Sequence, residues 1–91
     1  MEFEWDEEKS ERNRLDRGLD FGTAARIFEG PIQTAIDDRR DYGETRVIAV
    51  GEVDDRVLVV VYTDRNGVRR IISARRANRK EQETWRSSAR P

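Results

Sequence analysis

The sequence predicts a small α+β domain, in which an antiparallel β-meander packs against two N-terminal helices and is followed by a C-terminal helix. Three observations support this prediction. The chain has 91 residues, the length of one domain. Its second half contains three apolar runs separated by turn signals, and its first half contains two helix-start signals. We expect residues 1–91 to form one domain, with about 87–91 as a disordered tail.

The N-terminal third predicts a short strand and two helices. Phe3-Glu4-Trp5 alternates apolar and polar residues, as a short edge strand does. Asp6 suits a helix N-cap and Gly18 suits the residue that ends a helix, so a polar helix is expected between them. Asp20 suits a second N-cap. Four apolar residues follow it at the i, i+3, i+4 and i+7 spacing of an amphipathic helix that Gly30-Pro31 ends: Phe21, Ala24, Ala25 and Phe28.

The remaining elements are strands, until a last helix begins near Asn78. Ile32–Ile36 is compatible with a strand, and the charged segment Asp37–Glu44 predicts a loop. The meander is expected to consist of Arg46–Val53, Arg56–Asp64 and Val68–Ala74. Asp54-Asp55 and Asn66-Gly67 separate these strands, and Asn-Gly is a strong hairpin signal because a type I′ turn needs positive φ at both positions. Trp85 is the expected apolar anchor of the last helix.

Two-residue turns at both positions would fix the register and sort the two faces of the sheet. Tyr62 would lie opposite Val47 and Ile71, Val60 opposite Ala49 and Ser73, and Leu58 opposite Arg75. One face would be uniformly apolar and would receive the helices: Ile48, Val50, Val57, Val59, Val61, Ile72 and Ala74. The other would be open to a ligand, or would carry ordinary solvated residues: Val47, Ala49, Gly51, Leu58, Val60, Tyr62, Asp64, Arg69, Ile71, Ser73 and Arg75.

Composition excludes several classes of site. The chain has no histidine and no cysteine, which removes the commonest general base, disulfides, thiol nucleophiles and the usual structural zinc sites. We therefore expect no metal and no other cofactor. No apolar run approaches the ~20 residues of a membrane span, and the acidic N-terminus does not resemble a signal peptide. A cytoplasmic protein without a membrane partner is expected.

The formal net charge of −1 conceals an uneven distribution. Residues 1–45 carry seven basic and thirteen acidic side chains, whereas residues 46–91 carry eleven and six. Sixteen of the eighteen basic residues are arginine, which can bind phosphate bidentately. This pattern indicates contact with RNA or another phosphate ligand in the C-terminal half, and the alternative is a surface of salt bridges.

Several motifs, spaced in the same order, resemble the BrnT family, the toxin half of bacterial type II toxin–antitoxin pairs. The resemblance extends from Phe3 to about Trp85. Its residues are Phe3, Trp5-Asp6, Lys9, Asn13, Gly18, Phe21, Ala24, Phe28, Tyr42-Gly43-Glu44, Arg46, Gly51, Val60-Val61-Tyr62-Thr63 and Arg70-Ile71-Ile72-Ser73-Ala74-Arg75-Arg76-Ala77. The phrase Ile-Ser-Ala-Arg-Arg-Ala after a Val-Val-Tyr-Thr strand is its most specific part.

The resemblance implies a RelE-like domain and an endoribonuclease that cleaves mRNA, on the ribosome or free, to arrest growth. It also implies a BrnA-type antitoxin that neutralises the toxin, with two toxins paired to two antitoxins and DNA bound only through the antitoxin. The family usually has Lys-His immediately before Gly18, where this chain has Asp16 and Arg17, and a tyrosine where Trp85 stands. One alternative is therefore a weakened or inactive homologue that binds antitoxin and acts in operon co-repression. Another is a plain RNA-binding module.

The candidate site residues follow from the chemistry of RNA cleavage without histidine. Arginines aimed at the scissile phosphate can stabilise the charge that develops on it. The catalytic candidates are Tyr62, Arg75 and Arg76, and the RNA-binding candidates are Arg17, Arg46, Arg69 and Lys80. Glu81 and Glu83 are the remaining candidate bases. Three polar residues within one helical turn belong to a solvated helix, or else to a wall of an RNA groove or an antitoxin surface: Lys9, Arg12 and Asn13.

Overall fold

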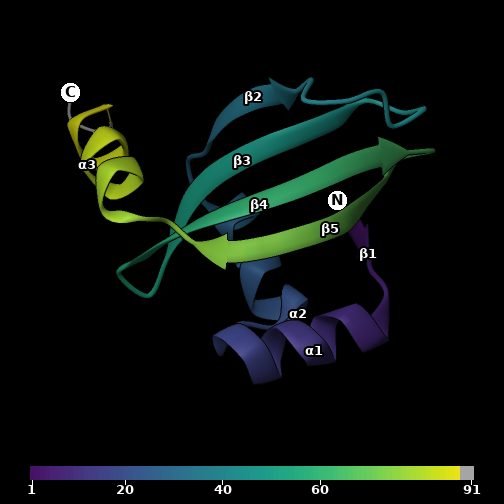
Figure 1. The fold of residues 1–91 in the computed structure, drawn as a ribbon, viewed down its shortest axis with the longest axis horizontal. Helices are drawn as coiled ribbons and strands as arrows, with labels where there is room; N and C mark the ends of the chain where they lie inside the picture. The colour runs from purple at the N-terminus through teal and green to yellow at the C-terminus, as the bar shows by residue number, and fades with distance from the viewer. Residues whose placement is uncertain (89–91) are drawn as a thin grey trace.

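The computed structural model describes residues 1–88 and contains a five-stranded sheet in the order β1-β5-β4-β3-β2 (Figure 1). In chain order the elements are β1 (Glu2–Glu4), α1 (Glu7–Arg17), α2 (Phe21–Ala24), the 3₁₀ helix η1 (Ala25–Glu29), β2 (Gln33–Asp37), β3 (Arg46–Val53), β4 (Arg56–Arg65), β5 (Val68–Arg76) and α3 (Arg79–Ser88). The predicted α+β class is therefore confirmed. Within residues 1–88, no helix is long and apolar enough to cross a membrane.

The strands β3 to β5 form the predicted antiparallel meander, and β2 extends it by pairing antiparallel with β3. Both predicted two-residue turns are present, with positive φ at Asp54 and Asp55 and again at Asn66 and Gly67. The short β1 pairs with the first residues of β5 in parallel orientation, which makes the complete sheet mixed. Because β1 is only three residues long, no strand of the described residues 1–88 lies on the outer side of the second half of β5.

The predicted caps define the N-terminal helices. The Asp6 carboxylate accepts hydrogen bonds from the backbone N–H groups of Glu8 and Lys9, and Gly18 adopts the left-handed conformation that ends α1. Asp20 accepts from the N–H of Thr23 and begins α2. The second predicted helix is one α-helical turn followed by the 3₁₀ turns of η1. At the other end of the chain α3 continues through Ser88, beyond the predicted start of the tail, and residues 89–91 lie outside the described residues.

The register of β5 on β4 is only partly as predicted. Tyr62 lies opposite Val47 and Ile71, and Ala49 lies opposite Val60, as expected. A bulge then shifts the β4–β5 register between Val61 and Tyr62. The pairings expected beyond this point are wrong, because Val60 lies opposite Ala74 rather than Ser73, and Leu58 lies opposite Arg76 rather than Arg75.

The prediction of which face receives the N-terminal helices is also wrong. The face expected to be open packs against α2 and η1 and forms the main core: Leu19, Phe21, Ala24, Ile27, Ala49, Val53, Leu58, Val60, Tyr62, Ile71 and Ala74. Gly51 shows the reason. A Cβ at this position would lie 2.7 Å from Cβ of Ile27, so the small residue makes room for the Ile27 side chain of η1 rather than for a ligand.

The opposite face, expected to receive both N-terminal helices, is covered at one end by α3 instead. Trp85 is buried there against Val57 and Val59, with Ile48 and Val50 packed around them. Trp85 also donates a hydrogen bond from Nε1 to Glu52 at 2.9 Å. Beyond α3 this face of the sheet remains accessible near Val61, Ile72 and Ser73. We call it the open face.

Candidate functional site

The helix α1 lies beside β5 and is attached through polar groups. The Asn13 amide donates to the carbonyl oxygens of Leu19 at 2.7 Å and Ala74 at 3.1 Å, and the Ser10 hydroxyl accepts from the N–H of Phe21. Leu15, the only large apolar residue of this helix, is 69% exposed. The helix therefore covers the outer side of β5 without burying an apolar stripe of its own.

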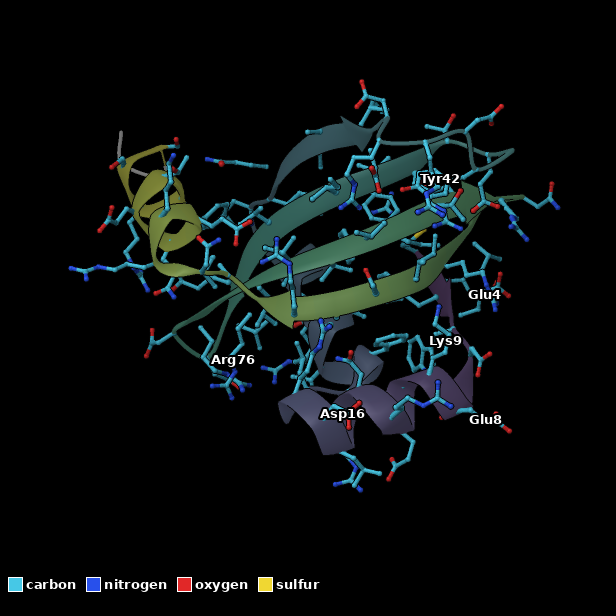
Figure 2. The ribbon with its side chains drawn as sticks, in the orientation of Figure 1. Glu4, Glu8, Lys9, Asp16, Tyr42 and Arg76 are labelled. Carbon is cyan, nitrogen blue, oxygen red and sulfur yellow. The ribbon has the colours of Figure 1, made fainter. Side chains whose placement is uncertain are left out.

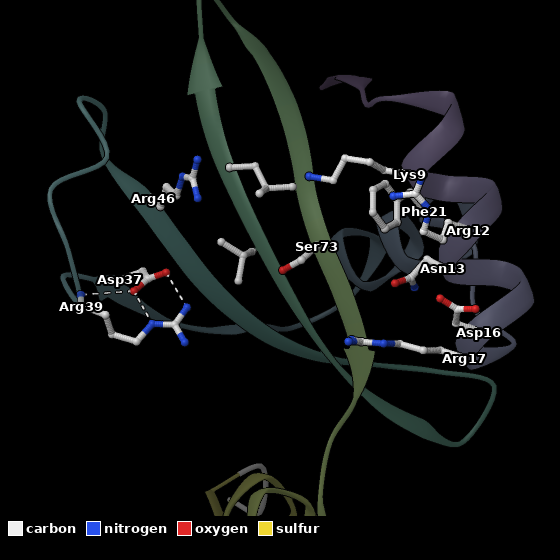
Figure 3. A pocket seen from close by; sticks show the side chains of 12 residues that line it. Lys9, Arg12, Asn13, Asp16, Arg17, Phe21, Asp37, Arg39, Arg46 and Ser73 are labelled. Atoms are coloured by element: carbon white, nitrogen blue, oxygen red, sulfur yellow. Dashed lines mark hydrogen bonds and ion pairs between the residues drawn. The ribbon is translucent and has the colours of Figure 1, made fainter.

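One face of α1 borders a hollow of about 380 Å³ on the open face of the sheet (Figure 3). We call this hollow the basic groove. Its first wall is the polar face of α1: Lys9, Arg12, Asn13, Asp16 and Arg17. Its floor consists of Phe21, Val61, Ile72 and Ser73, and its second wall of Asp37, Arg39 and Arg46.

The basic groove has a surplus of positive charge. Five of its side chains are cationic and two are carboxylates, although the whole chain has a net charge of −1. Figure 3 shows Lys9 extending from α1 over the sheet, with Arg46 on the opposite wall. A hollow of this volume can hold a small ligand or a nucleotide-sized part of a larger one. Its charge favours an anion, and its apolar floor favours a flat or apolar group.

Asp37 is a fixed part of the second wall. Its side chain is 1% exposed and receives two hydrogen bonds from Arg39, from Nε and Nη2, each 2.8 Å long. The Tyr42 hydroxyl donates to the same carboxylate at 3.2 Å. The Arg39 guanidinium lowers the pKa of Asp37 to about 2, so this carboxylate is ionised near neutral pH and is a poor proton acceptor.

Arg46 stacks on an aromatic ring beside this carboxylate. Its guanidinium carbon lies 4.0 Å from the centroid of the Tyr42 ring, and its Nε lies 3.5 Å from Glu44 Oε2. The Arg46 side chain is 28% exposed and lines the basic groove. Glu44 also binds Arg65, which lowers the pKa of Glu44.

Two of the seven predicted site residues, Arg17 and Arg46, line the basic groove. Arg75 lies on the same face of the sheet but is directed to α3, where it forms two hydrogen bonds with Glu81 at 2.7 and 2.8 Å. Glu81 in turn exchanges hydrogen bonds with Asn78 at the start of α3. Arg75 lowers the pKa of Glu81 to about 2, so this candidate base is a poor proton acceptor near neutral pH. Its hydrogen bonds with Asn78 make it part of a helix cap.

The other four predicted residues lie away from the basic groove. Tyr62 is 6% exposed in the main core, so the expectation that it faces open solvent is wrong. Arg69 lies 4.2 Å from the centroid of the Tyr62 ring and is held by Asp64, which places it on the helix-covered face. Arg76 is exposed at the end of β5 (Figure 2). Lys80 lines a smaller apolar hollow beside Trp85 on α3.

Three cations of the basic groove were absent from the predicted site: Lys9, Arg12 and Arg39. A signal for the first two is present in the sequence. The polar residues of α1 that border the groove fall at i, i+3, i+4, i+7 and i+8 from Lys9, the spacing of one helical face. In the structure this face of α1 borders the basic groove, and its contact with RNA or with an antitoxin stays a prediction. Arg39 has no comparable signal, because a loop position does not indicate which way it faces.

Comparison with known proteins identifies similarity at the level of the family. Residues 5–81 match the family model described as "Ribonuclease toxin, BrnT, of type II toxin-antitoxin system". No curated protein matches the chain. The matched segment includes every residue that lines the basic groove.

Proposed function

Because the chain belongs to the BrnT family of ribonuclease toxins from type II toxin–antitoxin systems, we propose that it cleaves mRNA within the basic groove. The observation that supports this location is the set of five cationic side chains around an accessible part of the sheet. Three of them come from one face of α1 and two from the opposite wall. A strand of RNA carries one phosphate per nucleotide, so two facing cationic walls suit a backbone that passes between them.

The proposed reaction is attack of an RNA 2′-oxygen on the adjacent phosphorus. The bond to the 5′-oxygen of the next nucleotide breaks, which gives a 2′,3′-cyclic phosphate and a 5′-hydroxyl. The proton of the 2′-hydroxyl passes to a carboxylate of the groove, and the leaving 5′-oxygen takes a proton from water. Negative charge increases on the phosphorus-bound oxygens in the transition state, and we assign Lys9, Arg12 and Arg17 to stabilise it.

Asp16 is the groove carboxylate that we assign to accept the proton from the 2′-hydroxyl. The other groove carboxylate, Asp37, is occupied by Arg39 and Tyr42. No ion pair within residues 1–88 holds Asp16, which lies on the groove-facing side of α1 (Figure 3). Replacing Asp16 with Asn should abolish cleavage while RNA binding stays equal or becomes tighter, because a negative charge leaves the groove. Undiminished cleavage by D16N would exclude this role.

A matched pair of arginines on α1 tests the proposed location. Arg12 lines the basic groove, whereas Arg14 lies outside it and pairs with Glu11. The R12A variant should bind single-stranded RNA about tenfold more weakly and cleave it more slowly, and R14A should resemble the unaltered protein. Equal behaviour of R12A and R14A in binding and cleavage would place RNA elsewhere.

An inactive homologue is the second candidate function, and Asp16 is also the observation that favours it. A carboxylate within a cationic groove opposes binding of a phosphate. In this case the purified protein would bind antitoxin but would not cleave RNA. Its role in the cell would be operon co-repression. Introducing Lys and His by D16K/R17H should then create toxicity on expression in a bacterial host. RNA binding without cleavage or a protein partner would instead indicate a plain RNA-binding module.

Membership of a type II toxin family implies an antitoxin partner. We propose that this partner is of the BrnA type, that two toxins assemble with two antitoxins in the cytoplasm, and that DNA is bound only through the antitoxin. Co-expression with the adjacent reading frame should relieve growth arrest and yield a complex whose mass, measured by light scattering, equals two copies of each chain. A purified toxin that binds operator DNA without its partner would contradict the last part of this proposal.

A further inference from the structure

Arg46 lines the basic groove and packs against the ring of Tyr42. Phosphate binding alone does not explain this contact. Arg46 stands at the start of β3, and Tyr42 lies in the loop between β2 and β3. The guanidinium carbon of Arg46 is 4.0 Å from the ring centroid, and Arg40 lies 5.9 Å from the same centroid. The Arg46 guanidinium therefore lies against the face of the Tyr42 ring.

The surroundings hold this pair in place. The Tyr42 hydroxyl is bound to the buried carboxylate of Asp37, which Arg39 holds through two hydrogen bonds. Arg46 Nε is buried and has no hydrogen-bond partner within residues 1–88, and its nearest ion-pair partner is Glu44 at 3.5 Å. The rest of the Arg46 side chain reaches the basic groove, and the side chain as a whole is 28% exposed.

This geometry favours a flat ligand over a second phosphate. The edge of a guanidinium that includes Nε is one of the edges that grip phosphate bidentately, and in Arg46 that nitrogen is buried. The groove floor contains Val61 and Ile72. Contact with a base would bury their apolar surface favourably, whereas contact with a charged phosphate would not. A nucleobase can stack on an arginine plane in the same way as on an aromatic ring.

We propose that Arg46, backed by Tyr42, is a nucleobase-stacking subsite of the basic groove. The inference rests on the proposed function, because it requires RNA in this groove. The stacked base must be unpaired, so the subsite selects single-stranded over double-stranded RNA. In this arrangement the cations of α1 hold the backbone on one wall while Arg46 on the other wall holds a base.

The test uses short single-stranded RNAs with 2′-O-methyl groups throughout, which cannot be cleaved by 2′-oxygen attack. Each RNA carries one abasic position, moved along the strand, and binding is measured by fluorescence anisotropy. For the unaltered protein, one abasic position should weaken binding about tenfold relative to the intact RNA. R46K keeps the positive charge but loses the plane, so it should bind the intact RNA about tenfold more weakly and that abasic RNA almost as well as the unaltered protein does.

R12A serves as the control for a phosphate contact and should weaken binding of intact and abasic RNA by the same factor. If R46K also weakens both equally, or has no effect, the stacking subsite is excluded. If neither R12A nor R46K changes RNA binding, the proposed function itself fails. Y42L should resemble R46K, because it removes the ring that packs against the Arg46 guanidinium. If Y42L does not fold, the comparison of R46K with R12A decides the question.

Discussion

Gly51 is the residue at which the 3₁₀ helix η1 comes against the sheet. A Cβ at Gly51 would lie 2.7 Å from Cβ of Ile27 and 3.2 Å from Cγ2 of Ile32. G51A should therefore lower the free energy of unfolding by about 1–3 kcal/mol, because the core must shift to admit one methyl group. Urea denaturation measures this change. G30A is the matched control, since a Cβ at Gly30 meets nothing within 4 Å, and equal losses in the two variants would contradict the packing argument.

Asp37 predicts a pH dependence of stability. Its pKa is lowered by Arg39 to about 2, below the ordinary value of about 3.9, so the unfolded chain binds this proton more tightly than the native protein does. The stability that Asp37 contributes should be complete above about pH 4 and should disappear as the pH falls through about 2. The difference in urea midpoint between the unaltered protein and D37N should therefore shrink between pH 5 and pH 2.5. A difference that stays constant over this range would contradict the assignment.

Helix ends and tight turns could be predicted from the sequence, because they depend on residues that are close together along the chain. Asp6, Gly18 and Asp20 are found at the helix ends where their chemistry placed them, and Asn66-Gly67 forms the expected turn. Such residues act on backbone groups within a few positions. Arg75 shows the limit of this reasoning, because its role depends on Glu81 of another element and not on its own chemistry.

At the scale of elements, the two faces of the sheet could not be assigned correctly from apolar content. Both faces are largely apolar: one forms the main core under α2 and η1, and the other packs against Trp85 of α3. The deciding property was size, since Gly51 leaves the space that the Ile27 side chain of η1 occupies. The bulge in the β4–β5 pair was also unpredicted, because the turn at Asn66-Gly67 fixes the register only up to the first irregularity.

The attachment of α3 depends on Glu81. Its carboxylate accepts from the N–H of Asn78 and from Arg75, while the Asn78 side chain accepts from the N–H of Glu81. E81Q weakens the contact with Arg75 and alters this reciprocal cap, so we expect a loss of about 1 kcal/mol and faster hydrogen exchange of the α3 amides. E83Q should have almost no effect, because Glu83 pairs with Arg79 only at a highly exposed site. Unchanged exchange in E81Q would show that Glu81 does not hold the helix and would leave Trp85 and the Arg86–Glu52 ion pair as its attachments.

At the scale of the whole molecule, charge is separated between the basic groove and the rest of the chain. The net charge of −1 gives little general attraction for nucleic acid, whereas five cations surround one hollow. Binding of single-stranded RNA should weaken with salt with a logarithmic slope no steeper than about −3.5, which corresponds to about −0.7 for each neutralised phosphate. R12A should reduce the slope by about 0.7 and R14A should leave it unchanged. A slope near zero would contradict a phosphate-binding groove.

The bulge between β4 and β5 has a consequence for how this family can change. Its extra residue is Ile72, because Ile71 lies opposite Tyr62 and Ser73 lies opposite Val61. Beyond the bulge, Arg75 lies opposite Val59 on the side of α3, and Arg76 lies opposite Leu58 on the side of the main core. Loss of the single codon for Ile72 would remove the extra residue and leave both of these pairings in place. One deletion would therefore reshape the floor of the basic groove, which Ile72 lines, without turning either arginine to the other face.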